Sequence, residues 1–544
     1  MEEPNLNPAL SEKDSILITY GDQLREPDTP PLRTLADFCA THLAGLISGV
    51  HILPFYPHSS DDGFSVIDYR AVDAKLGSWE DVARIGRTFR LMFDAVINHA
   101  SAGSAWFQAF LRDDPKYRNY FIVVEGDPDL SRVVRPRALP LLTRFTTPSG
   151  EKKVWTTFSE DQIDLNYREP EVLLQMVDLL LFYVSRGAEF IRLDATAFLW
   201  KEIGTPCIHL PQTHRIIQLL RAALDKAAPR VMLITETNVP HADNISYFGD
   251  GGNEAQMVYN FALPPLVLHT LRVGNARALS QWAARLTLPS KRVTFFNFLA
   301  SHDGIGLNPV RGILSEADIE ALVQQTLEQG GLVSHKFNPD GSQSPYELNI
   351  SYFDALCSTP RISATRGVLR FMSAQAIMLS LVGVPGIYFH SLFGSRGWPE
   401  GVNETGHNRT INRRKLGRAE VERELADPAS LRHQVFTRYA QLLKARAASP
   451  AFHPHGEQHT VDCGDSIFAI ARTSPDGRDN VLCLHNISDQ EQQAALDLRQ
   501  IFEAGVDRRC DLITGREFGA GQKLQIRLRP YESLWLAPIT TLQL

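Results

Sequence analysis

Residues 188–196 read Ala188-Glu-Phe-Ile-Arg-Leu-Asp-Ala-Thr196, a short apolar strand pattern that ends on a carboxylate. Alternating burial does not explain an arginine and an aspartate inside such a run, because a buried charge has to be paired or functional. One interpretation is a buried Arg192–Asp194 pair that only ties the strand into the fold. The other is a catalytic Asp194, since the carboxyl ends of the strands carry the chemistry in a parallel α/β barrel. Other stretches of the sequence favour the second interpretation.

Strand-like and helix-like segments alternate on both sides of this stretch. Apolar runs typical of strands lie at 15–20, 49–56, 91–98, 188–194, 231–236, 257–262, 293–299 and 377–389, and helical patterns at 32–46, 79–89, 170–186, 211–227 and 432–447. Such βαβα alternation is typical of a parallel sheet, and eight strands suggest a barrel. We therefore expect an α/β fold, a (β/α)₈ TIM barrel with inserted subdomains and a C-terminal all-β domain.

Two stretches are too long to be ordinary connections within a barrel. We expect barrel segments at 1–99, 167–303 and 367–453, an inserted subdomain B at 100–166, and an inserted loop-rich subdomain at 304–366. The Gly/Pro/Ser-rich residues 338–345 of the second insertion are typical of a mobile wall beside a site. Short alternating runs over 454–544 predict the C-terminal β domain.

Bulk composition limits the classes of partner. The chain has 544 residues, a formal net charge of −7 at pH 7 and no long run of like charges, which argues against nucleic acid or a membrane surface as a partner. We expect no signal peptide, because the first residues lack a basic and an apolar region, and no apolar run reaches spanning length. The six cysteines lack metal-ligand spacing, so we expect reduced thiols in a cytoplasmic protein.

Charged and polar residues gather where the predicted strands end. They are Asp94, Asn98 and His99 after the third strand, Arg192 and Asp194 on the fourth, Glu236 after the fifth, and His302 and Asp303 after the seventh. Two carboxylates about 5 Å apart suit glycoside transfer with retention, in which one attacks the anomeric carbon and the other moves the proton. Glu236 would need a raised pKa to hold that proton, while Arg192 would keep Asp194 ionised.

Several of these residues have structural alternatives. His99 and His302 could be satisfied structural histidines, and a His-Asp pair after a strand could bind a metal. No third nitrogen or sulfur ligand has suitable spacing, so we expect no metal and no cofactor. Asp61, in Ser59-Ser-Asp-Asp-Gly-Phe64, could belong to an acidic turn or contact a sugar hydroxyl.

Four motifs, in order along the chain, resemble the conserved regions of the α-amylase superfamily, glycoside hydrolase family 13. They are Asp94-x-x-x-Asn98-His99, Phe190-x-Arg192-x-Asp194-Ala195, Thr235-Glu236-Thr237 and Ala300-Ser-His302-Asp303. The resemblance covers the whole chain. It implies that Asp194 is the nucleophile, Glu236 the general acid/base and Asp303 the transition-state stabiliser, with Arg192, His99 and His302 around the glucosyl unit.

Within that superfamily the sequence is most similar to the sucrose phosphorylase subfamily. The segments 61–68 and 410–413 resemble the part of that subfamily that holds glucose, which implies contacts from Asp61 and Arg413 and an apolar platform from Phe64. The segments 135–137 and 345–349 resemble the elements that recognise phosphate and acceptor in turn. The residues so implied are Arg135, Arg137, Tyr346 and Glu347, and a guanidinium suits phosphate through paired hydrogen bonds.

The acceptor segment departs from sucrose phosphorylase itself. Glu347 stands where that enzyme has glutamine, and Ser344-Pro345 replaces Asp-Leu, which puts fructose as the leaving group in doubt. The segments 135–142, 302–307 and 393–396 look more like relatives that act on glucosylglycerate, glucosylglycerol or sucrose 6′-phosphate, and glucosylglycerate is favoured. An anionic acceptor calls for a nearby cation, and the candidates, left unranked, are Arg137, Arg144, Lys336 and Arg396.

The resemblance implies a retaining glucoside phosphorylase that uses a small-molecule glucoside and inorganic phosphate. An α-glucosidase or transglucosidase would share every carboxylate and differ only in the acceptor segment. A non-catalytic sugar-binding subunit is a further alternative, although it would not need all three carboxylates. The sequence is compatible with a homodimer without specifying one.

Overall fold

The computed structural model describes residues 10–137, 139–338, 341–357, 363–502, 508–519 and 523–539. Its centre is a closed barrel of eight parallel strands in the order β1-β16-β12-β11-β10-β9-β4-β3, so the expected barrel is confirmed. The strands are β1 (Ile16–Thr19), β3 (Gly49–Ile52), β4 (Arg90–Ala95), β9 (Ala188–Leu193), β10 (Met232–Thr235), β11 (Met257–Tyr259), β12 (Thr294–Asn297) and β16 (Val384–Tyr388).

Helices cover the outside of the barrel. The longer ones are α1 (Pro31–His42), α2 (Trp79–Gly86), α4 (Pro170–Ser185), α5 (Pro211–Ala227), α7 (Leu263–Val273), α11 (Ala364–Ser380), α14 (Arg418–Ala426) and α15 (Leu431–Ala447), and the shorter ones are α6 (His241–Ile245), α8 (Arg277–Ala283), α12 (Phe389–Leu392) and α13 (Pro399–Thr405). Four of them, α1, α4, α5 and α13, start on proline, which is favoured at the first helical position because its fixed φ is pre-organised and no donor is lost.

The eighth barrel strand begins later than the sequence predicts. The prediction of a strand over 377–389 was wrong at its start, because residues 377–380 form the last turn of α11 and β16 runs from Val384 to Tyr388. A continuous apolar run suits a buried helix as well as a buried strand. The third predicted strand, 91–98, likewise ends early: β4 stops at Ala95, and His99 opens the separate strand β5 (His99–Ser101).

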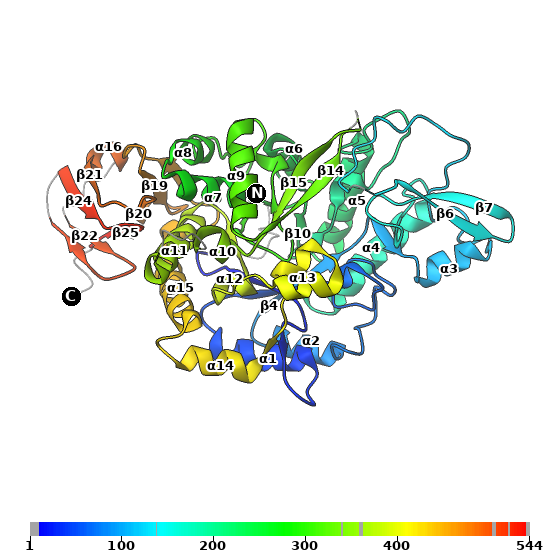
Figure 1. The fold of residues 1–544 in the computed structure, drawn as a ribbon, viewed down its shortest axis with the longest axis horizontal. Helices are drawn as coiled ribbons and strands as arrows, with labels where there is room; N and C mark the ends of the chain where they lie inside the picture. Colours follow the sequence, from blue (N-terminus) through cyan, green and yellow to red (C-terminus); the bar gives the residue numbers. More distant parts are fainter. Residues whose placement is uncertain are drawn as a thin grey trace.

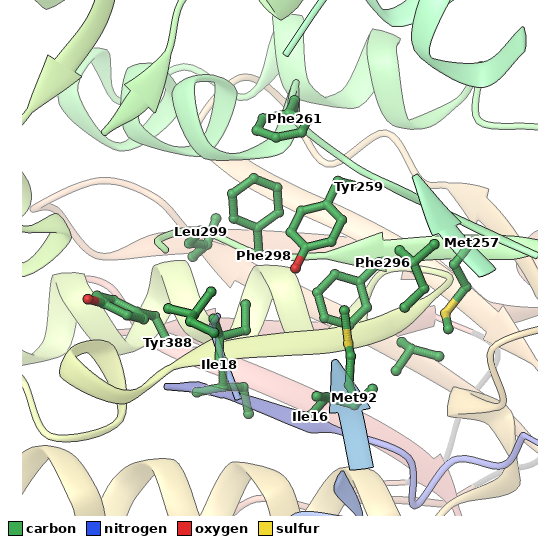
Figure 2. Packing of buried hydrophobic residues seen from close by; sticks show 14 of the residues in the cluster. Ile16, Ile18, Met92, Met257, Tyr259, Phe261, Phe296, Phe298, Leu299 and Tyr388 are labelled. Atoms are coloured by element: carbon green, nitrogen blue, oxygen red, sulfur yellow. The ribbon is translucent and has the colours of Figure 1, made fainter. Parts of the chain in front are cut away.

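Aromatic side chains fill the barrel beneath the strand ends. Figure 2 shows Tyr259 of β11 beside Phe296 of β12 and Phe298 just after it, with ring centroids 4.7 Å and 5.2 Å from that of Tyr259. The Arg192 guanidinium lies 5.4 Å from the Tyr259 ring centroid, so this packed core also supports a charged group of the strand end.

The stretch between β4 and α4 forms a lobe at one end of the molecule, on the right in Figure 1. It contains β5, α3 (Ala105–Leu111), the antiparallel pair β6 (Leu142–Thr147) and β7 (Gly150–Trp155), and β8 (Gln162–Asp164), which pairs with β5. A buried ion pair ties this lobe to the barrel. Lys201 Nζ lies 2.5 Å from Asp164 Oδ2 and donates to Asn98 Oδ1 at 2.8 Å, and both charged side chains are at most 2% exposed.

The stretch expected to be loop-rich, 304–366, is largely regular where the structure describes it. It holds β13 (Ile305–Gly306), α9 (Glu316–Glu328), the hairpin of β14 (Leu332–Phe337) and β15 (Gln343–Asn349), and α10 (Tyr352–Cys357). A capping box between Ser315 and Asp318 starts α9. Pro339 and Asp340 of the Gly/Pro/Ser-rich segment lie outside the described residues.

The C-terminal region packs β-sheets onto the barrel helices, at the left of Figure 1. A six-stranded sheet contains β18 (Glu457–Thr460), β19 (Ile467–Thr473), β20 (Asn480–Asn486), β25 (Ser533–Pro538), β22 (Arg509–Asp511) and β23 (Glu517–Phe518), and β21 (Gln492–Asp497) pairs with β24 (Lys523–Leu528). Alternate residues of β19 face opposite ways: Phe468 and Ile470 join the barrel core, whereas Ile467 and Ala469 join a second, smaller core.

None of the described helices is long and apolar enough to cross a membrane.

Candidate active site

A cavity of about 280 Å³ opens at the carboxyl ends of the barrel strands. The predicted site residues that line it are Asp61, Phe64, His99, Arg135, Arg137, Asp194, Glu236, His302, Asp303 and Tyr346. Asp194 and Glu236 each follow a barrel strand directly, and the parallel pairing of β9 with β10 sets them side by side. The sequence therefore brings its three predicted catalytic carboxylates into one cavity.

Arg192 lies beneath two of these carboxylates. Its Nη1 is 3.0 Å from Asp194 Oδ1, and its Nη2 is 4.0 Å from Glu236 Oε2. The Ala195 backbone N–H also donates to Glu236 Oε2 at 3.1 Å, from a residue with a φ of 50°. Such a left-handed conformation at a non-glycine residue is costly and often found at functional sites. Both carboxyl groups are thus held around a single guanidinium.

Asp94 and His51 fix Arg192 from below. Arg192 Nη1 also pairs with Asp94 Oδ1, and His51 Nε2 lies 2.7 Å from Asp94 Oδ2, all in side chains at most 2% exposed. Burial alone would raise the pKa of Asp94, but Arg192 and His51 outweigh it and lower that pKa to about 2. Asp94, which the sequence placed among the strand-end residues, is therefore a buried anion that orients Arg192.

Asp194 and Glu236 titrate together. Burial raises the pKa of Glu236, and the Asp303 charge adds to this while Arg192 opposes it. Burial also raises the pKa of Asp194. The charge of Glu236 raises it further, whereas Arg192 acts to lower it. Two such groups share one proton over a range of pH. The nearer guanidinium favours the charged form at Asp194 and leaves the proton on Glu236.

Asp303 is paired with a cation that the sequence did not single out. Arg409 Nη1 lies 2.5 Å from Asp303 Oδ1. The same guanidinium donates to Glu347 through Nε at 3.0 Å and Nη2 at 2.6 Å, and Glu347 Oε1 also accepts from the Gly304 N–H at 2.9 Å. Burial acts to raise the pKa of Asp303, but Arg409, His302 and Arg413 hold it well below its usual range.

A second group of charges lies at the outer edge of the cavity. Asp61 Oδ2 is 3.3 Å from Arg137 Nη2, and Asp61 Oδ1 is 3.6 Å from Arg413 Nη1. Arg413 Nη1 also pairs with Asp62 Oδ2 at 2.7 Å, and its Nε donates to the His302 carbonyl at 2.9 Å. Burial acts to raise the pKa of Asp61, whereas the two arginines outweigh it and lower that pKa. Asp61 is thus an anionic hydrogen-bond acceptor at the cavity edge.

An aromatic stack forms the floor of the cavity. The Phe64 and His302 rings are 4.7 Å apart and nearly parallel, at 7°. Burial lowers the pKa of His302 to about 3, so its imidazole is neutral over the physiological range. His99 Nε2 lies 2.8 Å from the Phe64 carbonyl oxygen and 3.2 Å from Gln162 Nε2. Neutral imidazoles beside an apolar ring suit a sugar, whose faces are apolar and whose edge carries hydroxyls.

Three predicted site residues do not line the cavity. Arg192, Arg413 and Glu347 are 2%, 5% and 1% exposed and lie behind its wall, where each pairs with residues that do line it. The sugar contact expected of Arg413 and the acceptor contact expected of Glu347 remain predictions, because neither side chain lines the cavity in this structure. Both arrangements instead orient the cavity carboxylates.

The candidate cations for an anionic acceptor separate clearly. Arg135, Arg137 and Lys336 line the cavity, together with Arg311, which the sequence did not single out. Arg144 lies on the β6–β7 hairpin, 63% exposed and paired with Glu151. Arg396 pairs with Asp354 at 2.8 Å and lines a different, smaller pocket. Arg144 and Arg396 therefore do not line the cavity.

Arg409, Gln162 and Arg311 were missed because nothing in their local sequence marks them. Each reaches the site only through the fold, and Arg409 lies close to the segment 410–413 that was recognised. Among the described residues, no group of three or more His, Cys, Asp or Glu side chains has the geometry to hold a metal ion.

Comparisons with known proteins identify the family of this chain. The alpha-amylase family, described as alpha amylase, catalytic domain, matches residues 43–304. Over 528 residues the chain is 52% identical to the glucosylglycerate phosphorylase of Allomeiothermus silvanus, covering 97% of this chain and 91% of that protein. It is 49% identical over 527 residues to the glucosylglycerate phosphorylase of Escherichia coli, covering 96% and 92%. The solved structure of sucrose 6F-phosphate phosphorylase from Thermoanaerobacter thermosaccharolyticum is similar with a TM-score of 0.77 at 25% identity, covering 89% of this chain and 96% of that one.

Proposed function

Because this chain belongs to the α-amylase family, glycoside hydrolase family 13, and within it to the sucrose phosphorylase-like enzymes, we propose that it transfers glucose from glucosylglycerate to inorganic phosphate. The chain is an enzyme of the glucoside phosphorylase type. The proposed products are α-glucose 1-phosphate and glycerate. Sucrose, sucrose 6′-phosphate and glucosylglycerol are the alternative glucosides.

In the first half of the reaction Asp194 attacks C1 of the α-glucoside. The bond from C1 to the acceptor oxygen breaks, and Glu236 gives its proton to that oxygen, so glycerate leaves and a β-glucosyl ester remains on Asp194. Asp303 accepts hydrogen bonds from sugar hydroxyls and stabilises the positive charge that develops on the ring. The proton that this step needs is the one that burial keeps on Glu236.

In the second half inorganic phosphate takes the place of glycerate. A phosphate oxygen attacks C1, its proton passes to Glu236, and the ester bond to Asp194 breaks to regenerate the carboxylate. The two displacements at C1 together retain the α configuration. Phosphate must outcompete water for this, which calls for a cationic acceptor region rather than a different set of carboxylates.

The observation that carries this proposal is the pair Asp194 and Glu236 around Arg192, facing a cavity that cationic side chains also line. Arg135, Arg137, Arg311 and Lys336 are among them, and guanidinium and ammonium groups bind phosphate through charge-assisted hydrogen bonds. The names of the relatives at about half identity over nearly the whole chain support glycerate as the acceptor.

We also propose that the enzyme works in the cytoplasm. All six cysteines are free thiols, which suits a reducing compartment. A homodimer is the proposed assembly, and its mass in solution is measured by light scattering.

The test is a panel of glucosylglycerate, glucosylglycerol, sucrose and sucrose 6′-phosphate, each incubated with and without inorganic phosphate. We expect α-glucose 1-phosphate to form fastest from glucosylglycerate and only with phosphate. Equal release of free glucose with and without phosphate would make the protein a hydrolase or transglucosidase. Faster phosphorolysis of another glucoside would keep the reaction and replace the acceptor.

A further inference from the structure

Most cations on the cavity wall already have an anionic partner inside the protein. Arg137 lies 3.3 Å from Asp61. Arg409 is shared between Asp303 and Glu347. A ligand that approached either arginine would have to displace a carboxylate that the site itself supplies. These two guanidinium groups therefore orient the cavity carboxylates.

Arg135 is occupied in another way. Its guanidinium donates to the Leu139 carbonyl and lies over the Phe337 ring, 5.3 Å from the centroid. These contacts hold the Arg135 guanidinium against Leu139 and the β14–β15 hairpin, and they leave some of its N–H groups for a ligand.

Lys336 differs from all of these. It lines the cavity, and within the part of the chain that the structure describes its ammonium group has no hydrogen bond or ion pair. It lies on β14 opposite Ser344 of β15. The pairing of β14 with β15 shifts at a β-bulge between Ser334 and His335, which leaves Tyr346 as the extra residue of β15. Lys336 and Tyr346 both line the cavity from this hairpin.

Arg311 is the neighbouring cation. Burial and the Arg311 charge both lower the pKa of Lys336, which places the two groups within each other's field. The only carboxylate paired with Arg311 among the described residues is Glu316, at 2.9 Å, and that side chain is 76% exposed. Asn238 and Asn308 line the same cavity, and each has a buried side-chain oxygen without a partner in the described structure.

We infer that Lys336, with Arg311 beside it, binds the carboxylate of the acceptor and so sets the preference for an anionic acceptor over a neutral one. This inference rests on the proposed function and names the residues of that same site that bind the charged group of the acceptor. Asn238 and Asn308 supply amide groups for the acceptor hydroxyls.

The rest of the cavity supports this placement of the carboxylate. Asp61, Asp194, Asp243 and Asp303 all line it, and an acceptor carboxylate near any of them would meet a like charge. At Lys336, by contrast, the acceptor carboxylate would meet a cation that has no carboxylate partner among the described residues. A charge-assisted hydrogen bond is roughly twice as strong as a neutral one, so this contact is sufficient to discriminate between acceptors.

The experiment measures synthesis from α-glucose 1-phosphate with glycerate or glycerol as acceptor. The two acceptors differ in one carboxylate, and the donor is the same, so any effect on phosphate binding cancels in the ratio. In Lys336→Met we expect kcat/KM for glycerate to fall about 10- to 100-fold and that for glycerol to change by less than about threefold. Lys336→Arg, which keeps the charge, should retain the preference for glycerate.

The control is Lys226→Met, which removes one exposed lysine at the end of α5 and should leave both activities unchanged. An equal fall with both acceptors in Lys336→Met would mean that Lys336 reads the phosphate of the donor, and it would overturn the inference. An unchanged preference for glycerate would overturn it as well. A wild-type protein that does not use glycerate refutes the proposed function itself, which is a different result from a failure of the lysine variants.

Discussion

Replacing Lys201 by methionine should loosen the lobe of residues 100–166 from the barrel. The change keeps the length of the side chain and removes its charge. Asp164, whose side chain is fully buried, then loses a cation 2.5 Å away, and Asn98 loses a donor at 2.8 Å. Breaking a buried ion pair by removing one partner costs about 3–5 kcal/mol, because the other charge remains without compensation.

The structure places the cost near the lower end of that range. Asp164 still accepts from the Thr157 N–H and hydroxyl, both at 2.7 Å, and from Asn98 Nδ2 at 3.2 Å. These three donors continue to stabilise the carboxylate. We therefore expect a loss of about 3 kcal/mol in the local stability of the β5–β8 pairing.

Amide hydrogen exchange over 99–101 and 162–164 measures this local stability directly, which matters because a chain of this size need not unfold in one step. A loss of about 3 kcal/mol corresponds to exchange about 100-fold faster. The double variant Lys201→Met with Asp164→Asn should recover most of the protection, since it removes the unpaired charge. Lys153→Met is the matched control: its partner Asp127 is 94% exposed, and surface pairs contribute about 0–1 kcal/mol. Unchanged exchange in Lys201→Met, or a double variant weaker than the single one, would refute the reasoning.

Three further predictions concern the cavity. Asp194→Ala should lower kcat by at least about 10⁴-fold while the protein still folds, and turnover near the wild-type rate would rule out Asp194 as nucleophile. In the wild type, kcat should fall as pH rises through the raised pKa of the Asp194–Glu236 pair, because Glu236 then lacks the proton for the leaving oxygen. Glu236→Gln should remove this decrease of kcat at alkaline pH and slow phosphorolysis by about 10²–10⁴-fold. A decrease at alkaline pH that persists in the variant would assign the proton to another group. Glu347→Gln should destabilise the protein by about 2–4 kcal/mol, because an amide N–H would face the Arg409 guanidinium; an unchanged unfolding midpoint would show that this pair adds no stability.

The barrel and the strand-end chemistry could be predicted because both are local in the sequence. An apolar run that ends on a carboxylate marks a strand and its functional end together, as at Asp194 and Glu236. The same reasoning failed at 377–389, where an apolar run without alternation belongs first to the buried end of α11 and only then to β16.

The ion pairs and hydrogen bonds behind the cavity wall could not be predicted from the sequence. Arg409 pairs with Asp303, which is more than a hundred residues away in the chain, and no spacing rule connects them. Glu347 and Arg413 were identified as site residues from the resemblance, but their positions behind the wall depend on the register of the hairpin and on the turn after α13. Contacts that the whole fold assembles leave no local pattern.

The double hydrogen bond between Glu347 and Arg409 constrains how the acceptor specificity of such an enzyme can be re-engineered. The two residues are 62 positions apart and belong to different segments, yet Arg409 pairs with both Glu347 and the catalytic Asp303. A transplant of strand 343–349 alone, with a neutral side chain at position 347, would remove one of the two carboxylates that pair with Arg409 and leave its guanidinium with Asp303. Chimaeras should therefore exchange the hairpin and the segment around 409 as one unit.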